Sequence, residues 1–130
     1  MWPIRSALFV PAHRRDWVGK AIRVSPGAAV LDIEDSVPPE FKAQAMENLK
    51  GEISELKTAN VGAFVRLNPL HEGTEEEITA AVTDGLTAVV LPKARTAAEI
   101  RRLHDLLSYQ EGRVGLAHGT VGILPLPETA

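Results

Sequence analysis

The sequence contains no cysteine among its 130 residues. Disulfide frameworks, thiolate metal sites and cysteine nucleophiles are therefore excluded. It also lacks any apolar run that approaches the roughly 20 residues needed to cross a bilayer. The N-terminal segment MWPIRSALFVPAHRR has an apolar part too short, and charges too late, for a secretion signal. We therefore expect a cytoplasmic protein with no membrane partner.

The sequence also lacks a large excess of positive or negative charge. The chain has 14 Lys and Arg against 17 Asp and Glu, intermixed along its length, for a net charge of −3. Without the basic stripe typical of nucleic-acid-binding proteins, nucleic acid is not expected as the main partner. The length suits one domain, residues 1–130. With 45% hydrophobic residues, the chain can bury a core.

Nucleotide-binding signatures are absent, since neither GxGxxG nor GxxxxGK[ST] occurs after an apolar run. What the chain does contain is a regular alternation of short apolar runs with helix-period segments. The pattern predicts strands over 7–11, 28–34, 63–69, 87–93 and 121–130. It predicts helices over 16–24, 39–57, 74–85 and 96–112.

The helix predictions depend on capping signals and periodicity. Thr74 with Glu77, and Thr96 with Glu99, have the spacing of a capping box. Gly85 and Gly112 are the expected stops. In the second helix, apolar residues recur at three- and four-residue steps and define a buried face: Phe41, Ala45, Leu49, Ile53 and Leu56.

This order, strand and helix in strict alternation, identifies an α/β protein. Strands separated by helices cannot form hairpins, so they pair in parallel through right-handed crossovers. Parallel strands are covered on both faces, which explains the continuous apolar runs. Two architectures fit: a doubly wound open sheet, or part of a (β/α)₈ barrel.

Polar residues gather at the C-terminal ends of the predicted strands, where parallel α/β folds bind their ligands. They are Asp32, Glu34, Asp35, Arg66, Asn68, Lys93 and Glu128. Side chains alternate along a strand, so Asp32 shares a face with Glu34, and Arg66 shares one with Asn68. A rim that carries cations and carboxylates together can hold an anionic substrate, with a divalent cation as a bridge.

Five segments carry a family resemblance: RSALFVPA, AVLDIEDSVPPEFKAQA, VRLNP, VVLPK and LPLPETA. In this order, each at a strand end, the chain resembles the HpcH/HpaI aldolase and citrate lyase beta-subunit family of (β/α)₈ barrels. A full barrel needs about 250 residues. The resemblance therefore implies a partial (β/α)₈ TIM barrel, the N-terminal part of a lyase domain, with about five parallel strands and four intervening helices.

The resemblance also implies an activity. Such proteins cleave or form carbon–carbon bonds in acyl-CoA or 2-oxo acid substrates, as citryl-CoA and malyl-CoA lyases do. They use Mg²⁺ or another divalent cation such as Mn²⁺. By analogy, the chain is expected to form homo-oligomers, as trimers or hexamers.

Site roles follow by position from the same resemblance. Glu128 is expected as a metal ligand that also contacts the substrate, with Asp32 as a second candidate ligand. Glu34 and Asp35 match the acidic cluster near the metal and are the catalytic candidates. The relatives' other carboxylate ligand, an Asp on the next strand, would come after Ala130.

Substrate contacts are implied for four further residues. Arg66 would pair with the substrate carboxylate and take part in catalysis, and Arg5, Asn68 and Lys93 would also bind the substrate. No histidine has a recognisable catalytic spacing, so the general base is not assigned.

Structural alternatives stay open for these residues. Asp32 and Glu34 could form ion pairs with Arg66 or Lys93 that serve the fold alone. Asp35 or Ser36 could cap the helix that begins near residue 39.

Two other functions are also compatible with the sequence. The chain could be a catalytically incomplete fragment or binding subunit whose open sheet edges need a partner chain. It could also be an open-sheet protein that binds a small anion.

Overall fold

Five parallel strands form one sheet in the order β1-β2-β3-β4-β5. The computed structural model describes residues 4–126. The strands are β1 Ala7–Pro11, β2 Ala28–Asp32, β3 Gly62–Arg66, β4 Leu86–Pro92 and β5 Gly122–Leu126. The helices are α1 Arg15–Arg23, the 3₁₀ turn η1 Pro39–Phe41, α2 Lys42–Thr58, α3 Thr74–Ala81 and α4 Ala97–Val114. The predicted α/β class and the parallel pairing are confirmed.

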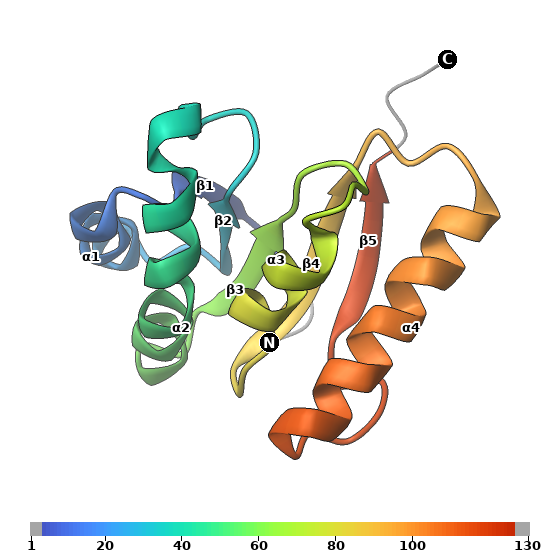
Figure 1. Cartoon of the computed structure of the whole chain (residues 1–130). Helices are drawn as coiled ribbons and strands as arrows, with labels where there is room; N and C mark the ends of the chain where they lie inside the picture. Colours follow the sequence, from blue (N-terminus) through green and yellow to red (C-terminus); the bar gives the residue numbers. More distant parts are fainter. Residues whose placement is uncertain (1–3, 127–130) are drawn as a thin grey trace.

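All four α-helices cover the same face of the sheet (Figure 1). The larger core cluster joins alternate strand residues such as Leu31 and Val65 to helix residues such as Val18, Leu49 and Leu103. Consecutive strand order with right-handed crossovers requires this one-sided arrangement. A doubly wound sheet would place helices on both faces, so the structure favours the barrel alternative.

The opposite sheet face has its own small apolar cluster, and its buried members come from strands alone. They are Ala28, Val30, Phe64, Ala88 and Val90. In a closed barrel this face lines the interior. Here Phe9 on β1 is 51% exposed and Leu124 on β5 is 45% exposed. The inner face is thus least covered at the two edge strands.

The helix boundaries show which local signals held. Thr96 and Glu99 form the predicted capping box at the start of α4. The box predicted at Thr74 is wrong, because α3 has Gly73 at its N-cap and no side-chain cap. The predicted stop at Gly112 is also wrong: α4 continues to Val114 and ends at Gly115, which is left-handed with φ 80°.

Two further differences affect the second and third helices. Phe41 belongs to the 3₁₀ turn and is 45% exposed. It stacks on the ring of His13 rather than joining the buried face of α2. Helix α3 ends at Ala81, before the predicted stop at Gly85. No helix within residues 4–126 is long and apolar enough to span a membrane.

Candidate active site

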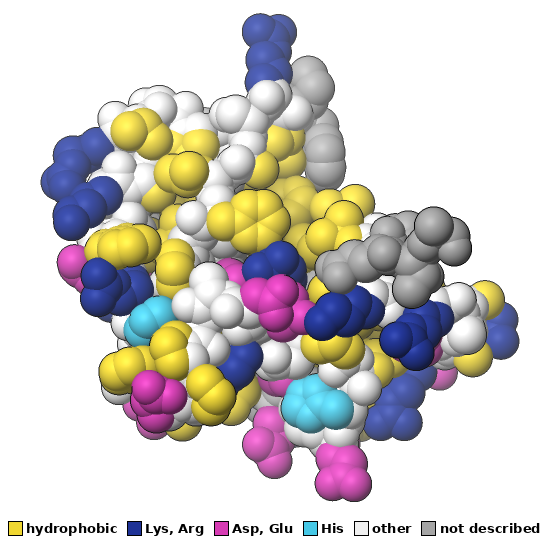
Figure 2. Space-filling view, turned by 90° about the horizontal axis from the view of Figure 1, so that it is seen from above, with side chains coloured by type: hydrophobic (Ala, Val, Ile, Leu, Met, Phe, Trp, Pro, Cys, Tyr) yellow, Lys and Arg dark blue, Asp and Glu magenta, His cyan; other side chains and the backbone are white. Residues whose placement is uncertain are grey.

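The C-terminal strand ends meet at one rim of the sheet, as parallel pairing requires. The register aligns Pro11 with Asp32, and Asp32 with Arg66. Figure 2 looks onto this end of the molecule and shows acidic and basic side chains against one another near the centre, with hydrophobic side chains around them. Strand register alone therefore brings Asp32 and Arg66 together from positions 34 residues apart in the chain.

Asp32 and Arg66 form a buried, bidentate ion pair at the centre of the rim. Arg66 Nε donates to Asp32 Oδ1 at 2.9 Å, and Arg66 Nη2 donates to Oδ2 at 2.7 Å. The same carboxylate accepts the Glu34 N–H at 2.9 Å, the Ser36 N–H at 3.0 Å and the Ser36 hydroxyl at 2.6 Å. Five donors therefore occupy both oxygens of a side chain that is 1% exposed.

This arrangement fixes the charge state of the pair. Burial alone would raise the pKa of Asp32, but the hydrogen bonds from Arg66 and Ser36 and from backbone N–H groups lower it below its ordinary value of 3.8. The hydrogen bond to Asp32 raises the pKa of Arg66. Both groups are thus ionised at neutral pH, and the Asp32–Arg66 contact on which the structural alternative depends is present.

Arg66 is held on a second side by an aromatic ring. Its guanidinium carbon lies 5.0 Å from the ring centroid of Phe9 on the inner sheet face. One edge of the guanidinium fork is used by Asp32, and a face is covered by Phe9. Within residues 4–126, Nη1 makes no hydrogen bond. A planar cation held in this way can still offer its outer edge to an anion.

Glu34 is the least satisfied group at the rim. Its side chain is 4% exposed, and neither carboxylate oxygen has a hydrogen-bond partner among the described residues. One oxygen lies 3.6 Å from Arg66 Nε and the other lies 3.6 Å from Lys93 Nζ. Burial first, and the neighbouring charge of Asp35 second, raise the pKa of Glu34. The carboxyl is thereby suited to exchanging a proton.

Lys93 reaches Glu34 through an unusual backbone turn. It follows the last residue of β4 and has φ 55°, in the left-handed region that non-glycine residues seldom adopt. Strand β4 ends at Pro92, so the alternation of side chains between the two sheet faces no longer applies at Lys93. The left-handed turn therefore sets the direction of the Lys93 side chain. The Lys93 side chain is 45% exposed, and its ammonium approaches the Glu34 oxygen that Arg66 does not approach.

We expect Lys93→Met to raise the pKa of Glu34 further, because Lys93 is one of the two cations that lower it. A carbon-detected NMR titration of the Glu34 carboxyl, assigned with Glu34→Gln, measures the change. Lys50→Met, at an exposed position on α2, is the control and should leave the titration unchanged. An unaltered Glu34 pKa in Lys93→Met would contradict the contact.

A second polar network lies on the helix side of the rim, and the sequence did not predict it. Lys42 Nζ donates to the carbonyls of Ile33 at 2.9 Å and Glu34 at 2.7 Å, and to Asn68 Oδ1 at 3.0 Å. Asn68 Nδ2 in turn donates to the Ile33 carbonyl at 3.2 Å and to Glu77 at 3.0 Å. The only signal was that Lys42 occupies the first turn of a helix, where a positive charge is unfavourable.

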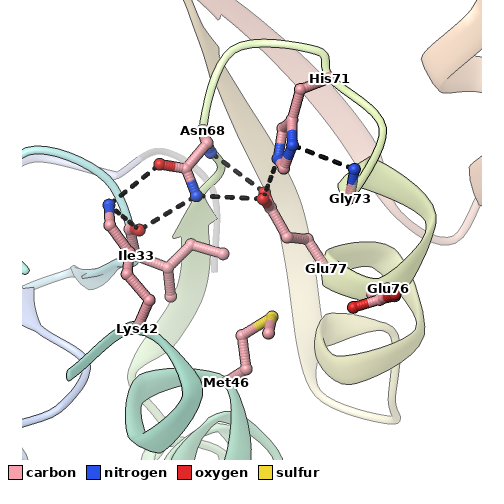
Figure 3. A pocket seen from close by; sticks show the side chains of 8 residues that line it. All are labelled: Ile33, Lys42, Met46, Asn68, His71, Gly73, Glu76 and Glu77. Carbon is pink, nitrogen blue, oxygen red and sulfur yellow. Dashed lines mark hydrogen bonds and ion pairs between the residues drawn. The ribbon is translucent and has the colours of Figure 1, made fainter. Parts of the chain in front are cut away.

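Glu77 completes this network. It accepts the Asn68 N–H at 3.1 Å and the Nε2 proton of His71, whose Nδ1 accepts the Gly73 N–H. Figure 3 shows these side chains around a cavity of about 280 Å³ between α2 and α3. The polar atoms of Lys42, Asn68 and Glu77 that reach this cavity already pair with one another.

The alternation of side chains predicted that Asn68 shares a face with Arg66. The structure instead places the Asn68 side chain in the helix-side network. Strand β3 ends at Arg66, so the alternation no longer applies two residues later. The Asn68 amide uses both of its N–H groups and its oxygen in the helix-side network. A substrate contact by Asn68 would require one of these hydrogen bonds to be exchanged.

Two other predicted residues, Arg5 and Asp35, are not brought into this cluster. Arg5 precedes β1 and lies at the opposite end of the sheet from the rim, because β1 runs from Ala7 toward Pro11. Asp35 is exposed and influences the cluster through its charge, which raises the pKa of Glu34 and contributes to the raised pKa of Arg66. Glu128 lies outside the described residues. The predicted helix cap at Asp35 or Ser36 is wrong, since η1 and α2 have no side-chain cap.

The described residues do not form a metal centre by themselves. Within residues 4–126, no three His, Asp or Glu side chains are grouped so as to hold a metal ion. A metal could reach Asp32, the predicted ligand, only by displacing Arg66 or Ser36. Glu34 has unbonded oxygens, but two cations lie 3.6 Å away and oppose a third positive charge. The groups of the rim that could meet an anion are the outer edge of the Arg66 guanidinium and the Lys93 ammonium.

Comparison with known proteins matches this architecture. The family model described as HpcH/HpaI aldolase/citrate lyase matches residues 5–130. A citrate lyase subunit beta-like protein of Deinococcus radiodurans is 37% identical over 108 residues, which cover 80% of this chain and 38% of that protein. The chain spans about two fifths of the length of the curated relatives it matches.

Solved structures show the same fold. A Haloferax volcanii malate synthase in complex with magnesium and glyoxylate has a TM-score of 0.81 at 16% identity, covering 98% of this chain and 43% of that one. A citrate lyase beta subunit from M. tuberculosis, complexed with oxaloacetate and magnesium, has a TM-score of 0.62 at 23% identity. It covers 92% of this chain and 56% of that one.

Proposed function

We propose a function from the premise that this chain belongs to the HpcH/HpaI aldolase/citrate lyase family, whose model matches residues 5–130. In this proposal the chain supplies the anion-binding part of a carbon–carbon lyase site. The substrate class is a CoA thioester or a 2-oxo acid. The observation that carries the proposal is the buried Glu34 carboxylate, which has no hydrogen-bond partner among residues 4–126 and has one oxygen 3.6 Å from Arg66 and the other 3.6 Å from Lys93. A small carboxylate bound to these cations would bring its reacting carbon close to Glu34.

Each residue of the rim then has a chemical task. Asp32 and Phe9 hold the Arg66 guanidinium, whose outer edge orients the substrate carboxylate. Lys93 offsets negative charge on the other side of Glu34. Asp35 acts indirectly, since its charge helps to keep the Glu34 pKa raised.

Glu34 is the proposed proton carrier. In cleavage of a 3-hydroxyacyl thioester, Glu34 would accept the hydroxyl proton as that oxygen becomes a carbonyl. The carbon–carbon bond breaks, and its electron pair passes to the enolate of the leaving thioester. A raised pKa lets the carboxyl take the proton and return it in the reverse, bond-forming direction.

A divalent cation belongs to this proposal through the relatives, two of which were solved with magnesium. When bound, Mg²⁺ would act as a Lewis acid on substrate oxygens. Its ligands would have to come largely from outside residues 4–126, and Glu128 is the candidate in this chain. The predicted trimer or hexamer remains a proposal on the same analogy.

Binding of glyoxylate in the presence of MgCl₂, measured by calorimetry, tests the proposal. We expect Arg66→Ala to weaken binding at least tenfold, since a charge-assisted bidentate contact contributes about 1.5–3 kcal/mol. Arg102→Ala, at an exposed position on α4, should bind as the unaltered chain does. Equal affinities for the unaltered chain and Arg66→Ala would contradict the proposal.

A second candidate is a binding component completed by other strands, either further along a longer chain or in a partner chain. The edge strands support it: β1 and β5 each pair with one strand among the described residues, and Phe9 and Leu124 on them are about half exposed. Glyoxylate calorimetry separates the two candidates, since a component of this kind would bind glyoxylate only after the chain or segment that supplies the other strands is added.

A further inference from the structure

Lys42 occupies a position that helix formation does not explain. It is the first residue of α2, a helix whose N-terminus has neither an acidic residue in its first turn nor a side-chain cap. A cation there opposes the helix dipole. Its ammonium nevertheless makes three hydrogen bonds of 2.7–3.0 Å, all to groups outside its own helix. The unfavourable interaction of Lys42 with the helix dipole is therefore offset by its hydrogen bonds to the loops after β2 and β3.

The groups that Lys42 binds are the two peptides that carry Glu34 beyond the end of β2. Strand β2 stops at Asp32, and the carbonyls of Ile33 and Glu34 both accept from Lys42. On the inner side, the Glu34 N–H donates to Asp32 Oδ1. The Glu34 backbone is thus fixed from both faces of the sheet.

This constraint explains how the Glu34 carboxylate can stay buried although it has no hydrogen-bond partner in the part of the chain that the structure describes. A carboxylate that lacks partners is costly to bury and would turn to solvent if its backbone could move. Asn68 extends the constraint, because it binds Lys42, the Ile33 carbonyl and Glu77. The loop after β2 is therefore tied to the loop after β3 and to α3, as Figure 3 shows.

We propose that Lys42 is a positioning residue that, with Asn68 and Glu77, holds the Glu34 peptide against the end of β3 and so sets the gap between Glu34 and Arg66. For ligand binding this inference rests on the proposed function. For the backbone geometry it stands on the hydrogen bonds alone. Lys42 itself touches no substrate, since its three donors are used inside the protein.

Two measurements on the full chain test the proposal. In Lys42→Met, the NMR signals of the Glu34 N–H, the Ser36 N–H and the Arg66 Nε–H should shift, because all three report the geometry around Asp32. Glyoxylate affinity in MgCl₂ should fall at least tenfold. Lys42→Arg keeps charged donors, so its NMR signals and its glyoxylate affinity should lie closer to those of the unaltered chain. Lys50→Met is the matched control on the same helix.

The outcomes separate this inference from the proposed function. If the unaltered chain does not bind glyoxylate while the three signals shift in Lys42→Met, the proposed function fails and the positioning role stands. If the signals stay in place, the positioning role is overturned. Should Lys42→Met not fold, couplings across the hydrogen bonds from the Lys42 ¹⁵Nζ to the carbonyl carbons of Ile33 and Glu34 decide in the unaltered chain. Their absence overturns the proposal.

Discussion

Asp32→Ala is expected to lower the free energy of unfolding by about 3–5 kcal/mol, the loss typical when one partner of a buried ion pair is removed. Asp32 is 1% exposed and accepts five hydrogen bonds, two of them from Arg66. The substitution leaves the guanidinium, whose side chain is 17% exposed, without its bidentate partner. It also removes the acceptor for the N–H groups of Glu34 and Ser36.

Urea unfolding followed by circular dichroism measures this loss. Asp105→Ala, at an exposed position on α4, should change the stability little. Adding Arg66→Met to Asp32→Ala should recover much of the loss, because the uncompensated charge is then gone. Equal stabilities for the single and double variants would show that the pair is not coupled as its geometry indicates.

The effect of Asp32 should also depend on pH. Folding lowers the pKa of Asp32, so the unfolded chain binds this proton more readily than the folded chain does. The stability from the ionised pair is therefore fully present above the ordinary pKa of 3.8. It is lost as the pH falls through the lower pKa of the folded state. The difference between the unaltered chain and Asp32→Ala should shrink over that acid range.

Strand and helix order could be predicted from the sequence because buried parallel strands leave a plain signal. The segment Ala7–Pro11 was predicted with the bounds that the structure has. The two capping boxes were predicted from the same spacing, yet only Thr96 forms one. At Thr74, the hydroxyl accepts the His71 N–H, while Glu77 turns to Asn68. Tertiary partners outcompeted the local motif there, and spacing alone cannot rank them.

The inner side of the rim was predictable for a related reason. Register between parallel strands places Asp32 beside Arg66 once both are recognised as strand ends. Strand register could not predict the contacts of Lys42, because they join the start of a helix to the loops that follow two strands. Asn68 was assigned to the wrong face because alternation was extended past the end of β3.

Glu52→Met is expected to stabilise the fold strongly at alkaline pH. Glu52 lies on α2, is fully buried, and has no hydrogen-bond partner for either oxygen among the described residues. Burial raises its pKa to about 8, although the charge of Arg15 opposes the shift. A pKa of about 8 favours the neutral carboxyl at pH 7. Burying a polar group that has no hydrogen-bond partner among the described residues carries a cost that methionine would not have.

The sign of the pH dependence follows from linkage. The folded chain keeps the Glu52 proton up to about pH 8, while the unfolded chain releases it near the ordinary value of 4.5. Stability contributed at this position is thus highest below pH 4.5 and falls as the pH rises toward 8. At about 1.4 kcal/mol for each pH unit, the advantage of Glu52→Met should grow by on the order of 4 kcal/mol between pH 5 and pH 8.5.

Urea midpoints and slopes at a series of pH values measure this advantage, with Glu47→Met as the control at an exposed position on the same helix. A pH-independent gain would mean that Glu52 is ionised in both the folded and the unfolded chain over this range. A loss of stability would mean that the carboxyl has a partner that methionine cannot replace. The charges that act on Glu52 are those of Arg15 and Glu55, not those of the rim residues. Glyoxylate binding should therefore not change in Glu52→Met. A variant with higher stability and equal affinity would separate the cost of this buried acid from the chemistry of the rim.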